Sequence, residues 1–400
     1  MSTTTVIVGA GIAGASAALR LRSGGCPGRV VLIGDEPHPP YRRPPLSKDL
    51  LSGKTPEERI RIRPQEAWSQ QGIELRTGTR VVALDVESRK VELADGEQLA
   101  YDQLLLATGG RPRELPQARG VPDVFTLRTI NDVSALRDKL RPGSSLLVVG
   151  AGLIGAEVAA TARGIGCAVM MLEAEQCPLS RLLPPQLAEV YTELHRSNGV
   201  DLHYGVQVAS LERVDLGVLV TDTTGRKWIA DTVLVAVGIA PNTELAEQAG
   251  LEIDAELGGI VVDEYLQTSA PGVFAAGDVA CAPNLHLGGR HRVEHWTSAQ
   301  EQGAAAAAGM LGERTSFDKV PWCWSDQYGK SLHVAGWPAA TDQVSVRGSL
   351  EDYEFTAVFH RDDRLVAAVG LNRPKDVRTA RKLIAEQPHV TADEVFAQLG

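Results

Sequence analysis

The chain has 400 residues, of which 44% are hydrophobic and 22% are charged, and its formal net charge is −10. This length exceeds one ordinary core and suits two or three domains. The negative charge argues against a general affinity for nucleic acid, which needs basic surface to displace phosphate counterions, and it disfavours anionic membranes. No apolar run approaches the roughly 20 residues that span a bilayer. The chain enters "TVIVGAG" at Thr5 without a signal segment, so we expect a cytoplasmic protein.

The first predicted unit is a strand, a glycine-rich turn, a helix and a second strand. It spans residues 3–36 and contains "TTTVIVGAG", "IAGASAALRLRSGG" and "RVVLIGDE". Its strands are continuous apolar runs, which is typical of parallel strands buried on both faces. Residues 76–109 follow as short alternating strands with a turn at Asp95-Gly96, which predicts an antiparallel meander.

The same plan occurs a second time. Residues 144–175 contain "SSLLVVGAG", "LIGAEVAATARGIG" and "CAVMMLEAE", and a second meander precedes the strand that ends at Gly238. This duplication predicts two doubly wound α/β domains, each with a parallel sheet. After Pro321, alternating strands and a final helix, "DVRTARKLIAEQ", predict a small α+β domain. The predicted domains are 1–112 with 240–320, then 113–239, then 321–400.

Each glycine-rich turn has the G-x-G-x-x-G spacing of a dinucleotide site. In this motif the first glycine makes the tight turn, the second lets backbone approach a pyrophosphate, and the third allows close helix packing. The pyrophosphate then binds at the helix N-terminus, where free N–H groups and the dipole favour anions. One such motif alone is weak evidence, but two in the same context predict two nucleotide sites. The glycines are Gly9, Gly11 and Gly14, then Gly150, Gly152 and Gly155, with Ile154 in the second turn.

An acidic residue after the second strand of each unit indicates which nucleotide binds. Glu173 follows "AVMML" at the spacing of a group that holds a ribose 2′-OH. A carboxylate there would repel a 2′-phosphate, so we expect NADH rather than NADPH. In the first unit Gly34 stands at the usual acidic position, which leaves Asp35 or Glu36, and Asp35 is nearer.

Two other strand ends carry residues suited to a ligand. "LLLATGGRP" ends a strand with Thr108 and Gly109, whose backbone must pass close to another group. "TSAPGVFAAGD" ends at Asp278, which is placed to accept hydrogen bonds from a polyol such as the ribitol of a flavin. The alternative for Asp278 is to cap a following helix.

The cysteines and histidines indicate neither disulfides nor a metal. The five cysteines are odd in number and include no Cys-x-x-Cys pair, so we expect small buried or half-buried residues at 26, 167, 177, 281 and 323. The histidines have no metal-ligand spacing, and no metal is predicted.

Several longer stretches give a resemblance that covers essentially the whole chain. They are "YRRPPLSKDLL", "ATGGRPR", "FTLRTINDV", "TSAPGVFAAGD", "VEHWTSAQEQG" and "VPWCWSDQYGKSLHVAG". With the doubled glycine motif, these resemble the two-dinucleotide flavoprotein reductases of the glutathione reductase structural class. The narrower resemblance is to the NADH-dependent ferredoxin reductases that serve bacterial Rieske dioxygenases and cytochrome P450 systems.

The resemblance implies FAD in the first unit, NADH in the second and a [2Fe–2S] ferredoxin as electron acceptor. Besides the glycines, the predicted FAD contacts are Ala13, Asp35, Arg42, Lys48, Val81, Thr108, Gly109, Arg128, Asp278 and Trp296. Arg43 lies in the same loop as Arg42 and is the alternative for the residue that faces the pyrophosphate. The resemblance places Lys48 near the flavin ring and Glu157 near the nicotinamide, with Gly238 in the return segment "GIAPN". The alternative for Lys48 is a solvated lysine on a loop. The alternative for Glu157 is a polar residue in the first turn of a helix, where the helix dipole favours an acidic side chain.

The resemblance also implies electron transfer without a cysteine relay. Related disulfide reductases carry a cysteine pair beside the flavin, whereas residues 41–51 here contain no cysteine. An NADH oxidase of the same fold would need a redox cysteine near the flavin, whereas we expect Cys26, in the loop before the second strand, to lie too far from it. An NADH- and FAD-binding sensor is the other alternative. Oligomeric state stays open between monomer and homodimer.

Two further features concern the electron-accepting partner. The family usually has Phe where this chain has Cys323, so an aromatic ring is missing near the expected face between flavin and partner. An acidic partner needs a local basic surface, because the chain itself is acidic. Arg378, Arg381 and Lys382 on a predicted helix are candidates, and a solvated helix face is the alternative.

Overall fold

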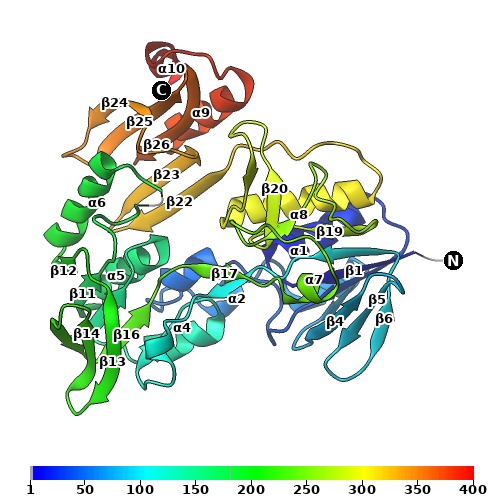
Figure 1. Ribbon diagram of the computed structural model, residues 1–400, viewed down its shortest axis with the longest axis horizontal. Helices are drawn as coiled ribbons and strands as arrows, with labels where there is room; N and C mark the ends of the chain where they lie inside the picture. Colours follow the sequence, from blue (N-terminus) through cyan, green and yellow to red (C-terminus); the bar gives the residue numbers. More distant parts are fainter. Residues whose placement is uncertain (1–2, 181) are drawn as a thin grey trace. The chain divides into compact units, whose positions relative to one another are not determined.

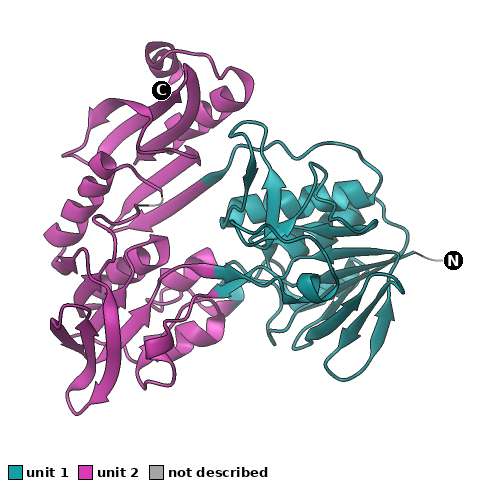
Figure 2. Cartoon of the chain, viewed as in Figure 1, with its two compact units in different colours: residues 1–42, 58–111, 240–322 teal, residues 43–57, 112–239, 323–400 magenta. Residues whose placement is uncertain are grey.

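The computed structural model describes residues 3–180 and 182–400 (Figure 1). The chain divides into two compact units, which Figure 2 colours separately. Unit 1 comprises residues 1–42, 58–111 and 240–322, and unit 2 comprises 43–57, 112–239 and 323–400. Residues 43–57 thus group with unit 2, although they lie within the segment predicted for the first domain. The predicted division into three domains stays a prediction.

A parallel sheet of five strands forms the centre of unit 1 in the order β19-β7-β1-β2-β3. The strands are β1 (Thr4–Val8), β2 (Arg29–Ile33), β3 (Ile73–Arg76), β7 (Gln103–Leu106) and β19 (Val273–Ala275). Helices α1 (Ile12–Ser23) and α8 (Trp296–Met310) pack against each other. Their backbones approach closely because the contact consists of small residues. A Cβ on Gly303 would lie 2.1 Å from the Ala13 carbonyl oxygen.

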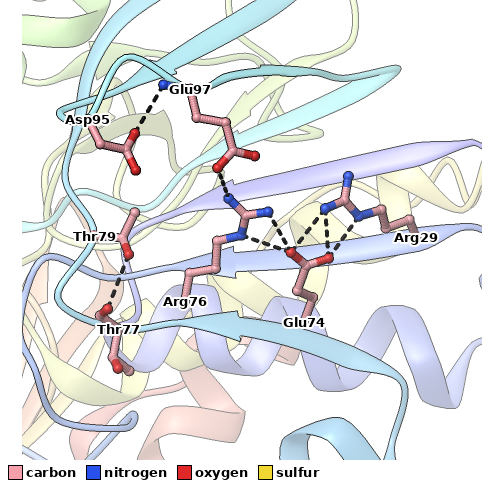
Figure 3. Close-up of polar contacts among 7 residues, drawn as sticks. All are labelled: Arg29, Glu74, Arg76, Thr77, Thr79, Asp95 and Glu97. Carbon is pink, nitrogen blue, oxygen red and sulfur yellow. Dashed lines mark hydrogen bonds and ion pairs between the residues drawn. The ribbon is translucent and has the colours of Figure 1, made fainter.

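The predicted meander of unit 1 is confirmed as β4 (Val81–Asp85), β5 (Lys90–Leu93) and β6 (Gln98–Ala100). Gly96 in the turn has φ +89°, which glycine adopts readily. Charged side chains link this meander to the edge strand β3 of the parallel sheet (Figure 3). The Glu74 carboxylate binds Arg29 and Arg76, and Arg76 also binds Glu97. These charges line the edge strand, which is how natural sheets discourage pairing with another chain.

The remaining elements of unit 1 are short and lie around these two sheets. They are α2 (Glu57–Ile60), whose first residue lies in unit 2, α3 (Gln65–Gln70), α7 (Glu244–Gln248), β18 (Ile260–Val261), β20 (Ala280–Pro283) and β21 (Arg290–His291). Strand β8 (Gly110–Pro112) pairs with β17 (Ile239–Pro241).

Unit 2 contains a second parallel sheet with the equivalent strand order, β9-β16-β10-β11-β12. These strands are β9 (Val124–Phe125), β10 (Ser145–Val149), β11 (Ala168–Leu172), β12 (Val200–His203) and β16 (Thr232–Val235). Both sheets place the strand that leads into the glycine turn at the centre. The predicted second meander is confirmed as β13 (Val208–Val214), β14 (Gly217–Asp222) and β15 (Lys227–Ala230).

Helices α5 (Leu153–Ile165), α6 (Pro185–Ser197) and α4 (Ile130–Arg137) accompany this sheet. Thr129 and Asp132 form a capping box at the start of α4. Two 3₁₀ turns, η1 (Pro44–Ser47) and η2 (Pro116–Ala118), complete this part, and η1 packs against α5.

The C-terminal part of unit 2 is a sheet in the order β22-β23-β26-β25-β24, with antiparallel pairing along β23-β26-β25-β24. Its strands are β22 (Trp322–Gln327), β23 (Lys330–Gly336), β24 (Gln343–Ser349), β25 (Glu354–Arg361) and β26 (Arg364–Leu371). The predicted final helix is α9 (Pro374–Glu386), and a short α10 (Ala392–Gln398) follows it. Leu187 and Tyr191 of α6 share one apolar core with Phe355 and Phe359 of β25. This common core explains why these segments form one unit.

The predicted fold class, two doubly wound domains followed by a small α+β domain, is therefore confirmed. Within residues 3–180 and 182–400, no helix combines the length and the apolar character that crossing a bilayer requires. Across the same residues, no three or more His, Cys, Asp or Glu side chains gather as metal ligands would.

Candidate functional site

In the glycine turn of unit 1, a different physical reason explains each of the three glycines. Gly9 has φ +111°, and a Cβ there would lie 2.1 Å from the carbonyl oxygen of Ala107, so the turn passes directly over the end of β7. A Cβ on Gly14 would lie 2.0 Å from the Gly9 carbonyl oxygen, which is how α1 packs onto the turn. Gly11 faces open space instead and caps α1 without any side-chain hydrogen bond. Because Gly11 has no side chain, nothing at this position covers the first N–H groups of α1.

The glycine turn of unit 2 repeats this geometry. Gly150 has φ +102°, and a Cβ there would lie 2.5 Å from the Ala236 carbonyl oxygen. A Cβ on Gly155 would again lie 2.0 Å from the carbonyl oxygen of the first glycine. Gly152 again faces open space at the start of α5 and makes no side-chain cap. Both helix N-termini therefore have the open, uncapped form that suits a pyrophosphate.

The acidic positions differ between the two units for a steric reason. The Glu173 carboxylate lies directly after β11 and accepts hydrogen bonds from the N–H groups of Ala151 (2.6 Å) and Glu175 (3.0 Å). It is thereby held against the glycine turn, where the predicted ribose would bind. In unit 1 a Cβ at the equivalent Gly34 would lie 2.6 Å from the Cβ of Ala10. This contact explains why glycine replaces the usual acid there.

The structure brings two of the predicted FAD residues of unit 1, Ala13 and Asp278, into one neighbourhood. A Cβ on Gly277 would lie 3.1 Å from the Ala13 Cβ, so the chain leading to Asp278 passes over the first turn of α1. The Gly277 N–H donates to the Gln302 side chain (2.7 Å), a contact that the sequence alone did not indicate. The alternative role of Asp278 as a helix cap is wrong, because strand β20 follows it.

A second contact fixes the strand end at Thr108 and Gly109. The Thr108 hydroxyl donates to the Asn242 carbonyl oxygen (2.7 Å), and the Asn242 side chain donates back to the Thr108 carbonyl oxygen (2.9 Å). The Asn242 N–H donates to the Gly109 carbonyl oxygen (2.9 Å). Asn242 lies within the quoted segment "GIAPN", but its role depends on a partner more than 130 residues away.

The other predicted FAD residues occupy varied surroundings. Asp35 is exposed just after β2, whereas the neighbouring Glu36 accepts a hydrogen bond from the Tyr41 hydroxyl. Arg42 is exposed and donates to the Arg59 carbonyl oxygen (2.6 Å). Val81 is buried at the start of β4. Three further predicted residues complete the set: Trp296 begins α8 in unit 1, and Lys48 and Arg128 belong to unit 2.

Arg128 and Lys48 both lie close to η1 and its flanking residues. The Arg43 guanidinium donates to the Arg128 carbonyl oxygen, and the Arg128 N–H donates to Asp132 at the start of α4 (2.9 Å). Lys48 follows η1 directly, and its Nζ lies 2.7 Å from the Glu157 Oε2 atom. The two residues predicted to be nearest the reacting rings therefore form an ion pair.

This ion pair is nearly shielded from water. The side chains of Lys48 and Glu157 are 18% and 5% exposed. The Glu157 Oε2 atom also accepts from the Ser47 hydroxyl, and Oε1 accepts from the Ser325 hydroxyl (2.7 Å). A buried ion pair is tolerable only when its remaining hydrogen-bonding capacity is met, and these hydroxyls meet it. Sequence reasoning missed Ser47 and Ser325, although both lie in the quoted motifs "PPLSK" and "WCWSDQ".

Cys323, the residue that departs from the family pattern, lies in the same region of unit 2. Its thiol is buried in the apolar core that also contains Tyr191. Burial, together with the nearby Glu157 charge, raises the pKa of Cys323 to about 12. At neutral pH the thiol is therefore protonated and unreactive.

The two other predicted nicotinamide-nucleotide residues lie in different places. Ile154 is 44% exposed on the first turn of α5, which is unusual for a large apolar side chain. Gly238 has φ +101° and follows β16, and its carbonyl oxygen accepts a hydrogen bond from the Arg113 N–H (2.9 Å).

Two duplicated dinucleotide folds, each with an open glycine turn, define a protein class that binds two nucleotides for redox chemistry. Comparison with known families agrees. The model of the pyridine nucleotide-disulphide oxidoreductases matches residues 3–303, and that of the reductase C-terminal domain matches residues 322–398. The chain belongs to the pyridine nucleotide-disulphide oxidoreductase family.

Several similar proteins are named as reductases of putidaredoxin or ferredoxin. The putidaredoxin reductase of Pseudomonas putida is 38% identical over 402 residues, covering 97% of this chain and 94% of the relative. The ferredoxin–NAD(+) reductase component of the p-cumate 2,3-dioxygenase system of Pseudomonas putida is 38% identical over 388 residues, covering 96% and 94%. The solved covalent putidaredoxin reductase–putidaredoxin complex matches with a TM-score of 0.94 at 37% identity, covering 98% of this chain and 95% of that chain.

Proposed function

We propose that this chain is an FAD-dependent NADH:ferredoxin oxidoreductase that supplies electrons to an oxygenase or a cytochrome P450. Relatives that match over nearly their whole length are named as reductases of this kind, which supports the assignment. The observation that carries the proposal is the pair of open glycine turns, each at the start of a helix with uncapped N–H groups. We further propose a cytoplasmic location, which the five unpaired cysteines favour.

The residues of each unit fit the nucleotide proposed for it. FAD would be held by the turn of unit 1, with its pyrophosphate on the N-terminus of α1 and its ribitol at Asp278. NADH would be held by the turn of unit 2, with a ribose hydroxyl on Glu173. The open space at Gly11 and Gly152 is what such backbone approaches require. The other predicted FAD and NADH contacts remain part of this proposal.

The catalytic contribution of the protein is mainly to position and to shield. Bound FAD supplies the chemistry that nicotinamide lacks, since it accepts two electrons together and releases them one at a time. Lys48 would stabilise negative charge at the ring, because a cation in a water-poor site is already oriented when charge develops. Glu157 holds that cation in place through the 2.7 Å ion pair. No cysteine pair beside the flavin is proposed, since residues 41–51 contain no cysteine, and Cys323 is buried with a raised thiol pKa.

The electron acceptor would be a small [2Fe–2S] ferredoxin with an acidic surface. Its proposed docking residues lie on α9, the helix predicted from sequence. Arg378 and Lys382 are exposed one turn apart, and Arg381 is half-buried beside them. Lys382 also forms a 3.7 Å ion pair with Glu386, which reduces the positive charge available to a partner.

Anaerobic mixing with NADH tests the proposal. We expect the purified protein to bind FAD, and NADH to bleach the flavin absorption rapidly. Cytochrome c should then be reduced only after a [2Fe–2S] ferredoxin is added. Rapid oxygen consumption without ferredoxin would instead indicate an NADH oxidase. Slow bleaching would indicate a sensor, and failure to take up flavin would exclude all three.

A further inference from the structure

We propose that Ser325 of the C-terminal sheet is a positioning residue that fixes the orientation of the Glu157 carboxylate and, through it, Lys48. This inference rests on the proposed function, because it concerns the reduction of bound flavin by NADH. It assigns to the C-terminal domain a part in the first half of the reaction, apart from any contact with ferredoxin.

The argument begins with how the two carboxylate oxygens of Glu157 are divided. Oε2 accepts from the Ser47 hydroxyl and lies 2.7 Å from Lys48 Nζ, so this oxygen serves the segment after η1. Oε1 accepts from Ser325, at 2.7 Å. The last torsion of a glutamate side chain has only broad preferences, so hydrogen-bond partners decide its orientation. By holding Oε1, Ser325 fixes the plane of the carboxylate and so the direction in which the other oxygen faces Lys48.

The direction of the Ser325 hydroxyl is itself fixed. Gln327, two residues along β22, donates from its amide Nε2 to the Ser325 oxygen at 3.1 Å. A hydroxyl has one hydrogen to donate, and here its oxygen accepts from Gln327. That hydrogen is thus directed to Glu157. Ser325 is fully buried and Gln327 is 2% exposed, so water does not compete for these bonds.

A buried histidine of α6 lies close to this amide. The Nδ1 atom of His195 is 2.8 Å from the hydroxyl of Tyr328, the residue that follows Gln327. Packing alone would favour an apolar residue at a fully buried strand position such as 325. The hydroxyl is better explained by its bond to Glu157.

The test compares Ser325→Ala with a matched control in the same domain. Thr356 is buried and donates its hydroxyl to the buried Asp376 carboxylate at 2.8 Å, so Thr356→Ala removes the same kind of bond away from Glu157. Both variants should unfold at temperatures lower by a few degrees. Only Ser325→Ala should slow the limiting rate of flavin bleaching by NADH, by about tenfold, the equivalent of one hydrogen bond to a charged group. The NADH concentration giving half that rate should stay within about twofold, because binding and positioning are separate.

Three further variants separate loss of the hydrogen-bond donor from a change in side-chain volume, and an effect through Glu157 from general damage to the fold. Ser325→Thr retains the donor and should bleach at nearly the wild-type rate, whereas Ser325→Cys, a weak donor, should fall between wild type and Ser325→Ala. In a Glu157→Gln background Ser325→Ala should add less than a twofold further loss in either bleaching rate or unfolding temperature.

The inference is overturned if Ser325→Ala and Thr356→Ala bleach at equal rates, or if Ser325→Thr is as slow as Ser325→Ala. It is also overturned if the Ser325→Ala loss is undiminished beside Glu157→Gln. Should Ser325→Ala not fold, Ser325→Cys and Ser325→Thr supply the same comparison. If NADH fails to bleach the wild-type protein, the proposed function itself is wrong, and that outcome is recognised before any variant is compared.

Discussion

Gly152→Ala gives the most direct test of the second nucleotide turn, because the structure separates its effect on binding from its effect on folding. A Cβ at this position meets no atom within 4 Å, and the backbone φ of −74° is ordinary for alanine. The cost to the fold is limited to a poorer helix cap, about 1 kcal/mol. The added methyl group would occupy the surface through which the pyrophosphate approaches the N–H groups of α5. Loss of one such charge-assisted hydrogen bond corresponds to roughly 1.5–3 kcal/mol, or a ten- to hundredfold rise in the NADH concentration required.

Two other glycines on the same helix provide the controls. Gly164 also faces open space, and alanine there should stabilise α5 by about 0.5–1 kcal/mol without affecting NADH. Gly155 is the opposite case, since its Cβ would lie 2.0 Å from backbone, and Gly155→Ala should destabilise the protein itself. Stopped-flow bleaching over a range of NADH concentrations, with thermal unfolding of each variant, measures both effects. If Gly152→Ala and Gly164→Ala require the same NADH concentration, the second turn does not bind the pyrophosphate.

Three further predictions concern specificity, pH and docking. Glu173→Ala should raise the KM for NADH about tenfold, because one hydrogen bond to the ribose is lost. It should also lower the ratio of kcat/KM for NADH to kcat/KM for NADPH, which steady-state kinetics with both nucleotides measures. Burial lowers the pKa of His195 from 6.5 to about 4, so the unfolded chain takes up that proton first as pH falls. The free energy of unfolding should therefore fall by about 3 kcal/mol as the pH is lowered from 6.5 to 4. In urea unfolding, the His195→Gln variant should lack this part of the decrease. Changing Arg378, Arg381 and Lys382 to Glu should raise the apparent KM for ferredoxin and leave ferricyanide reduction unchanged; equal loss with both acceptors would contradict the docking surface.

Much of the fold could be predicted from the sequence because its signals are local. Each glycine turn, its preceding apolar strand and its following helix lie within about 30 residues, and their spacing carries the geometry. Repetition of the turn and the meander was sufficient to predict the duplication. A helix cap at Asp278 could not be rejected in this way, since only the strand after it decides the question.

The candidate site was predicted only in part. Lys48 and Glu157 were named through the resemblance, but their ion pair and its two serines were not. Ser47 and Ser325 lie 110 and 168 positions from Glu157 in the chain. No local sequence pattern predicts which hydroxyl will hydrogen-bond to a carboxylate more than 100 residues away in the chain.

The sequence by itself predicted the two glycine turns, because a glycine spacing specifies backbone that a phosphate can approach whatever surrounds it. Only the tertiary structure decided how the charged pair in unit 2 is held. That arrangement depends on η1, α5 and β22 packing together, and on a core that excludes water from the bonds between them. A hydrogen bond between distant segments exists only once folding has brought donor and acceptor within reach.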